Sequence, residues 1–153
     1  MRVVKIDPKA KTVEFHELPD KRGQVENKDI YESLGCEYMQ FINIMPHVLL
    51  IIDEEGLRKF NHHWATNDFN AYAGIGLLCG WDPETEDLLP VPDNFNKADL
   101  MRHILWIGDD QKYERAIQQG LFRRPKQELI AGNERQTLWE WTPHEPDRPH
   151  YNN

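Results

Sequence analysis

The sequence of 153 residues lacks the features that mark several large classes of protein. No apolar run approaches the ~20 residues that a membrane-spanning helix needs. The chain has only two cysteines, and they do not form a pair with zinc-finger spacing. It also contains no Gly-rich phosphate-binding loop, nucleophile elbow, HExxH sequence or EF-hand loop. These absences disfavour a membrane protein, a zinc finger and the common enzymes that carry such motifs.

The N-terminal segment, MRVVK, lacks the apolar stretch of a signal peptide. We therefore expect the protein to stay in the cytoplasm, which would be the host cytoplasm if the chain is viral. Disulfides are rare in that compartment. Cys36 and Cys79 both lie in apolar contexts, so the sequence predicts buried free thiols rather than a disulfide.

Positive charge is also scarce, because 26 acidic residues outnumber 18 basic ones and give a net charge of −8. This balance disfavours direct binding of nucleic acid, which needs a basic surface. An acidic protein can instead present carboxylates where a nucleic-acid-binding protein expects phosphates. The acidic residues are scattered along the chain, which favours an ordinary solvated surface over such mimicry.

The first 35 residues predict two strands followed by a helix. Residues 2–6 and 12–18 have strand character, and Pro8 lies in the turn between them. Asn27 is suited to cap a short helix that ends at Gly35, because glycine favours the left-handed conformation after a helix C-terminus.

Residues 35–80 contain the densest apolar segments. Residues 37–44 and 47–52 read as two strands joined by a short link, which favours an antiparallel hairpin. Gly56 is expected to supply a positive φ in the following turn. Residues 74–80 read as one more buried strand, whose glycines indicate close backbone approach or a bulge. The predicted fold class is α+β, with an antiparallel-leaning sheet of about five strands covered by a helix.

Several short motifs in this half resemble the DUF3846 family. They are Ile30-Tyr31, Leu34-Gly35-Cys36, Asp53-Glu54-Glu55-Gly56-Leu57, Asn61, Ala65 and Gly74-Ile75-Gly76-Leu77-Leu78. The resemblance covers about residues 1–80, and His62, His63 and Trp64 alter the usual spacing around the Asn–Ala pair. Members are small domains, many from phages and other mobile elements, without an established common activity. The resemblance implies a phage or viral origin and a role such as antagonism of host defence, but it assigns no catalytic residue.

The second half predicts a helical elaboration on that core. Residues 81–96, rich in proline and acidic residues, are expected to form an extended connection that leaves the sheet. Asn96 and Asp109 are expected to cap two helices that end at Gly108 and Gly120. The apolar stripe predicted to pack the first helix consists of Leu100, Met101, Ile104 and Leu105. Residues 136–141 could add an edge strand to the helical hairpin within residues 97–141, and residues 142–153 are expected to be extended or disordered.

One polar cluster is the strongest candidate for a site. It consists of Asn61, His62, His63, Trp64, Asn67, Asp68, Asn70 and Tyr72. Amides and imidazoles can read polar edges of a ligand, and aromatic rings can stack on flat groups. There are two alternatives. One is a metal site, and the other is a polar surface loop that binds no ligand. Adjacent histidines point in different directions in a strand or helix, which weakens the metal alternative.

The sequence therefore predicts a small non-enzymatic binding protein, without a cofactor, that sequesters a nucleotide-like ligand or blocks a host protein. A metal-assisted nucleotide hydrolase using His62, His63 and Asp68 is one alternative, and an acidic-mimic inhibitor is another. Trp64 distinguishes a ligand site from a structural segment, because it either stacks on a ligand or packs in the core. Association with a second copy of the chain stays open.

Overall fold

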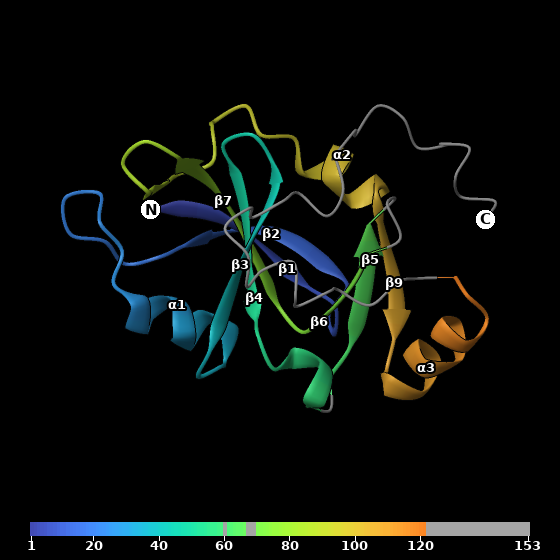
Figure 1. Ribbon diagram of the computed structural model, residues 1–153. Helices are drawn as coiled ribbons and strands as arrows, with labels where there is room; N and C mark the ends of the chain where they lie inside the picture. Colours follow the sequence, from blue (N-terminus) through green and yellow to red (C-terminus); the bar gives the residue numbers. More distant parts are fainter. Residues whose placement is uncertain (60, 67–69, 122–153) are drawn as a thin grey trace.

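The computed structural model describes residues 1–59, 61–66 and 70–121. Within these ranges the chain forms two antiparallel sheets and three α-helices (Figure 1). The strands are β1 (Arg2–Asp7), β2 (Thr12–Glu17), β3 (Met39–Met45), β4 (Val48–Asp53), β5 (His63–Thr66), β6 (Ala71–Ala73), β7 (Gly76–Asp82), β8 (Asp87–Leu89) and β9 (Ile104–Gly108). The helices are α1 (Asn27–Leu34), α2 (Lys97–Arg102) and α3 (Asp110–Gln118), with a short 3-10 helix, η1 (Gly56–Arg58). This architecture confirms the α+β class.

The main sheet has the strand order β2-β1-β7-β4-β3, and β8 pairs with β7 beyond that path. Every pairing is antiparallel. The β1–β2 and β3–β4 hairpins confirm the four strands predicted from residues 2–52, and β7 confirms the strand predicted near Gly80. The short links between these strands are long enough for hairpins but too short for a parallel crossover.

Side-chain alternation gives the main sheet two apolar faces. Val4, Leu50 and Leu78 face one core cluster, which also contains residues of the second sheet. Their chain neighbours, such as Val3 and Leu77, face a second cluster that includes the buried side chains of α1. Successive residues of a strand point to opposite faces, so the near-continuous apolar runs of β1, β4 and β7 fill both cores at once.

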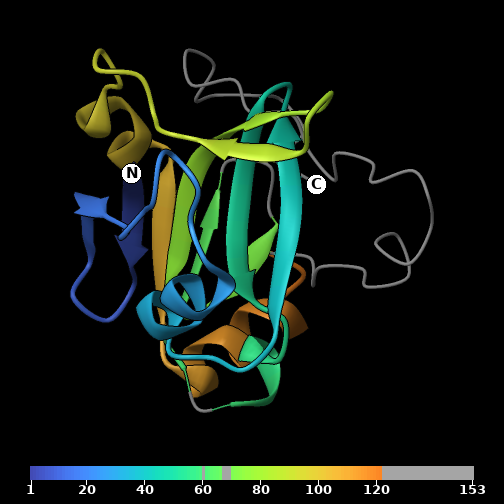
Figure 2. The ribbon, with the colours of Figure 1, turned by 90° about the vertical axis from the view of Figure 1, so that its left-hand side faces the viewer.

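The second sheet, with the order β6-β5-β9, also packs on both faces. Trp64 and Tyr72 belong to the core shared with the main sheet, whereas Ala65 and Ala71 pack against Tyr113 of α3. The resulting layers are α1, the main sheet, the second sheet and α3. Figure 1 shows α1 and α3 on opposite sides of the strands, and Figure 2 shows α1 lying across the lower part of the main sheet.

The helix predicted to run from Asn96 to Gly108 was wrong beyond its first turns. Asn96 does cap α2, because its side chain accepts a hydrogen bond from the Asp99 backbone N–H, but α2 ends at Arg102. The residues that follow form β9, which pairs with β5. Of the predicted stripe only Leu100 is buried; Met101 is 37% and Leu105 is 53% exposed. The segment ILWIG has strand propensity, and pairing with β5, distant in the sequence, decides its structure.

The other turn and cap predictions had mixed outcomes. Gly35 is in the left-handed conformation with φ +67, and Asp109 caps α3, both as predicted. Asn27 is instead the first residue of α1, after Glu26, and no side chain caps this helix. Gly56 has no positive φ; a Cβ there would lie 2.8 Å from the Ala73 carbonyl oxygen, so close approach explains this glycine.

Residues 81–96 do not leave the sheet at once, since they first form the β7–β8 hairpin. The predictions for residues 122–153, including the edge strand at 136–141 and the tail at 142–153, fall outside the described residues. Both cysteines are free thiols, as predicted; Cys79 is buried, which raises its pKa to about 12, and Cys36 is half-buried. In the described part of the chain, no helix is long and apolar enough to cross a membrane.

Candidate functional site

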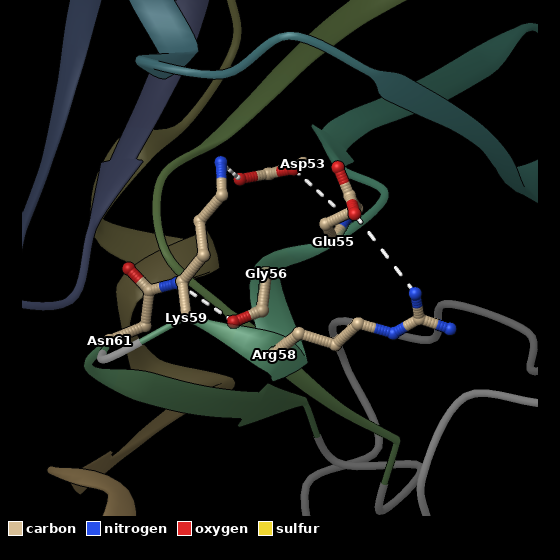
Figure 3. Close-up of polar contacts among 6 residues, drawn as sticks. All are labelled: Asp53, Glu55, Gly56, Arg58, Lys59 and Asn61. Carbon is tan, nitrogen blue, oxygen red and sulfur yellow. Dashed lines mark hydrogen bonds and ion pairs between the residues drawn. The ribbon is translucent and has the colours of Figure 1, made fainter.

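A buried carboxylate ends β4 and organises the connection to the second sheet. Asp53 is only 8% exposed, and its Oδ2 accepts a hydrogen bond from the Lys59 ammonium at 2.7 Å. Its Oδ1 accepts a second bond from the Glu55 backbone N–H at 2.9 Å. A buried carboxylate is costly unless such partners compensate for lost water. Figure 3 shows Lys59 reaching across the turn to Asp53 while Arg58 extends toward Glu55.

The ion pair with Asp53 also fixes the charge state of Lys59. The hydrogen bond to Asp53 is the main reason why the pKa of Lys59 is raised, and burial opposes this shift. The lysine side chain is still 42% exposed. It therefore presents to solvent or to a ligand an ammonium group whose charged form is favoured and which is held in place by one carboxylate oxygen.

Asn61 locks the same turn from its other end. Its side-chain Nδ2 donates a 2.8 Å hydrogen bond to the Gly56 carbonyl oxygen. Its Oδ1 would lie 3.4 Å from a Cβ at Gly74, a residue with φ +80. The Gly74 backbone N–H in turn donates to the His62 carbonyl oxygen at 2.8 Å. Several residues of the family motif thus have a structural explanation, because they hold the main sheet and the second sheet together.

These residues form part of a polar cleft of about 400 Å³. The cleft lies where the β1–β2 turn, the C-terminal end of α1 and the connection from β4 to β5 meet. Its lining consists of Asp7, Pro8, Lys9, Leu34, Gly35, Asp53, Lys59, Asn61, His62, Gly74 and Ile75. The name polar cleft is used below for this set.

The two carboxylates of the polar cleft both have hydrogen-bond partners within the protein, whereas one of its two lysines has no ion-pair partner among the described residues. The Asp7 carboxylate accepts hydrogen bonds from the backbone N–H groups of Lys9 and Ala10, and Asp53 is engaged as described above. The Lys9 side chain is exposed and forms no ion pair with any described residue. The lining of the cleft consequently includes two lysines and the half-buried His62, while both of its carboxylates already accept hydrogen bonds from the protein itself.

Of the eight residues predicted from the sequence to form a site, the structure brings two to the polar cleft. They are Asn61 and His62. Four others, His63, Trp64, Asn70 and Tyr72, are buried in the second sheet or beside it, each at most 4% exposed. Asn67 and Asp68 lie outside the described residues. The predicted loop between two strands is itself the β5–β6 hairpin.

The side chain of His63 lies in a different environment from that of its chain neighbour His62. Its Nε2 lies 2.6 Å from Asp110 Oδ1, and its ring stacks on Tyr113 with centroids 4.0 Å apart. Burial lowers the pKa of His63, although Asp110 acts in the opposite direction. The two histidines named for the hydrolase alternative therefore point to different parts of the molecule. Among the described residues, no three His, Cys, Asp or Glu side chains are grouped to hold a metal ion.

Trp64 packs in the core. The side chain is 1% exposed, and its indole N–H donates to the Gly74 carbonyl oxygen at 2.9 Å. The ring lies against Tyr72, and a Cβ at Gly76 would come within 2.9 Å of it. In this conformation Trp64 has no free face for a ligand. This environment matches the structural alternative considered for the segment.

Sequence reasoning missed most of the residues that line the polar cleft, including Asp7, Lys9, Asp53 and Lys59. Asp53 was noticed only as part of a turn. A lysine six residues after a motif aspartate was the available signal, since both flank one tight turn. The contribution of the β1–β2 turn had no signal in the sequence, because it depends on how the strands of the main sheet are ordered.

The fold and the cleft define a two-sheet α+β domain with a polar cleft at the junction of its sheets. The chain belongs to DUF3846, a domain of unknown function, whose family model matches residues 1–120. The match extends well past the residues on which the resemblance was recognised and includes the second sheet and α3. No curated protein and no solved structure showed a significant match.

Proposed function

We propose that this protein is a non-enzymatic binding protein that sequesters a small nucleotide-like ligand in the polar cleft. One observation carries the proposal. Lys9 and Lys59 both line one cleft of a protein whose net charge is −8, and the carboxylates of Asp7 and Asp53 beside them are already hydrogen-bonded. An anionic group such as a phosphate is the natural partner for this arrangement.

The remaining lining fits the rest of such a ligand. His62 and Asn61 carry nitrogen and oxygen atoms that can bond with hydroxyls or base edges. Leu34, Pro8 and Ile75 supply an apolar wall. A volume of about 400 Å³ lies within the ~300–1,000 Å³ range of small-molecule pockets.

The preorganised state of Lys59 supports tight positioning of the ligand. A lysine normally loses rotamer freedom when it binds. The hydrogen bond to Asp53 has already restricted this side chain, and two of its three N–H groups are not committed to Asp53. Binding should therefore cost less ordering entropy at Lys59 than at an unconstrained surface lysine.

A thermal-shift screen against nucleotides, cyclic nucleotides and divalent metals tests the proposal. A ligand that binds only the folded state increases the free energy of unfolding, by about 2.7 kcal/mol at a ligand concentration of 100 times Kd, and so raises the melting temperature. We expect a shift with one nucleotide class and its loss in Lys59→Met. Lys28→Met is the matched control, because Lys28 is an exposed lysine outside the cleft. Equal shifts in both variants would contradict the proposal.

The second candidate function is inhibition of a host protein. This host protein could be a nucleic-acid-binding protein that binds the acidic surface in place of phosphates. The net charge of −8 favours it. Capture of a nucleic-acid-binding protein from host lysate, with release by duplex DNA and not by nucleotides, would separate it from the first candidate. An origin in a phage or other mobile element belongs to both proposals.

A further inference from the structure

We propose a second binding site, for a planar cation of the guanidinium type, at the opposite end of α1 from the polar cleft. A cavity of about 440 Å³ lies there between the N-terminal end of α1, strand β3 and the β7–β8 hairpin. Its lining consists of Gly23, Gln24, Val25, Asn27, Ile30, Phe41, Asn43, Leu49, Trp81, Glu86, Asp87 and Leu88. We call it the acidic-aromatic cleft. It shares no residue with the polar cleft, so it does not depend on the proposed function.

The cleft exists because α1 is too short to cover the sheet. This helix has eight residues, which span about 12 Å at 1.5 Å per residue. It buries Ile30 and Leu34 against one part of the sheet and leaves the end near β8 open. Figure 2 shows α1 confined to the lower part of this face. Phe41 and Trp81 line the open part and are only half-buried.

Two asparagines, Asn27 and Asn43, line the cleft beside Phe41 and Trp81. Asn43 interrupts an apolar row on β3, since its pairing partner Leu49 belongs to the core on the α1 side. Asn27 was predicted to cap α1, but no side chain caps this helix, and Asn27 is one of the residues that line the cleft. Both amides thus have a place at the cleft that their expected structural roles do not explain.

Two acidic residues line the cleft and favour a positively charged ligand. Glu86 and Asp87 are both exposed, and neither forms an ion pair with another residue of the described chain. Among the described residues that line the cleft there is no lysine or arginine, so Glu86 and Asp87 give this part of the surface two negative charges. A cation is therefore the complementary ligand.

A planar cation fits better than an ammonium group. A guanidinium stacks on an aromatic face and at the same time donates parallel hydrogen bonds to a carboxylate. Trp81 and Phe41 provide aromatic surface, and Glu86 and Asp87 provide acceptors. The shared chemistry could come from a free guanidino compound or from an arginine side chain of a polypeptide.

Glu86 also holds a backbone conformation that favours glycine. Its φ is +61, at the end of a turn in which its N–H donates to the Asp82 carbonyl oxygen at 2.7 Å. Replacement with glycine would relieve the strain and remove the carboxylate together. Glu86→Gly should therefore weaken binding without lowering the melting temperature, which separates an effect on binding from a loss of stability.

NMR titration of the full chain tests the site. The probes are acetyl-Gly-Arg-Gly-amide, its citrulline and lysine analogues, and methylguanidinium. We expect the arginine peptide to shift the Trp81 indole N–H signal and to bind at least tenfold more tightly than the neutral citrulline peptide. Tighter binding of the peptide than of methylguanidinium would indicate a polypeptide as the source, and equal binding would indicate a small guanidino compound.

The variants complete the experiment. Glu86→Gly and the double variant Glu86→Gln with Asp87→Asn should each weaken binding of the arginine peptide at least threefold. Glu84→Gln is the matched control, since Glu84 is an exposed residue of the same hairpin that does not line the cleft. Equal affinity for arginine and citrulline, or an equal loss in Glu84→Gln, would overturn the proposal. Absence of any Trp81 shift at 20-fold molar excess and millimolar peptide would also overturn it.

Discussion

His63 Nε2 lies 2.6 Å from the Asp110 carboxylate, although the two residues are 47 positions apart in the sequence. The pair joins β5 of the second sheet to the first turn of α3. Hydrogen bonding to a carboxylate places the proton of the neutral imidazole on Nε2. Stacking on Tyr113 then fixes the ring plane. One histidine thus connects two layers of the fold, which explains its burial better than a ligand-binding role would.

This environment predicts a pH dependence of stability. Burial lowers the pKa of His63 below its ordinary value near 6.5, and that of His16 is also lowered, chiefly by burial. The unfolded chain therefore takes up protons at these positions before the folded chain does. The contribution of these two histidines to the free energy of unfolding should be fully present above about pH 6.5. It should be lost as the pH falls from there through the folded-state pKa values.

Denaturant titrations at several pH values between 7.5 and 5 measure this effect. His63→Gln should flatten the dependence below pH 6.5, whatever its stability at pH 7.5. His16→Gln is the comparison, because it removes only the contribution from β2. A wild-type protein whose stability rose between pH 6.5 and 5.5 would refute the sign of the His63 shift.

Trp64→Ala is predicted to be a stability variant. Truncation of a fully buried tryptophan costs ~3–5 kcal/mol, and the lost indole would also leave the Gly74 carbonyl oxygen without its donor. Urea denaturation of the variant and the wild type gives the difference. Unchanged stability combined with weakened ligand binding would instead favour the stacking role considered for this residue in the sequence.

Leu100→Asp and Met101→Asp form a matched pair that tests the revised structure of residues 97–108. Leu100 is 5% exposed in the main core, and an unpaired buried charge should cost several kcal/mol. Met101 is 37% exposed, so its substitution should change stability by ~0.5 kcal/mol or less. The helix predicted from the sequence would make both variants strongly destabilising, and comparison of their melting temperatures separates the two structures.

Local patterns predicted the parts of the fold that are determined locally. The two hairpins follow from the short links between their strands, and the cap of α3 follows from the single side chain of Asp109. The second sheet could not be predicted, because β9 pairs with β5 across about 40 residues and its apolar residues fit either a helix or a strand. The same non-local pairing buries Trp64, which the sequence left open between two roles.

The candidate site shows the same division. Asn61 and His62 were found because they lie in one polar segment, whereas Lys9 and Lys59 reach the polar cleft from separate turns. Only the order of the strands in the main sheet brings the β1–β2 turn beside the end of α1. A cleft assembled from three segments has no compact signature in one sequence.

A backbone NMR titration of the isotope-labelled protein with nucleoside monophosphates tests the central claim most directly. The account predicts saturable shifts of the amide signals of Lys9, Lys59, His62 and Gly74, with loss of those shifts in Lys59→Met. The Ala65 amide, buried in the second sheet, should stay unchanged. Absence of shifts at millimolar concentration of any nucleotide, or shifts that persist unchanged in Lys59→Met, would contradict binding in the polar cleft.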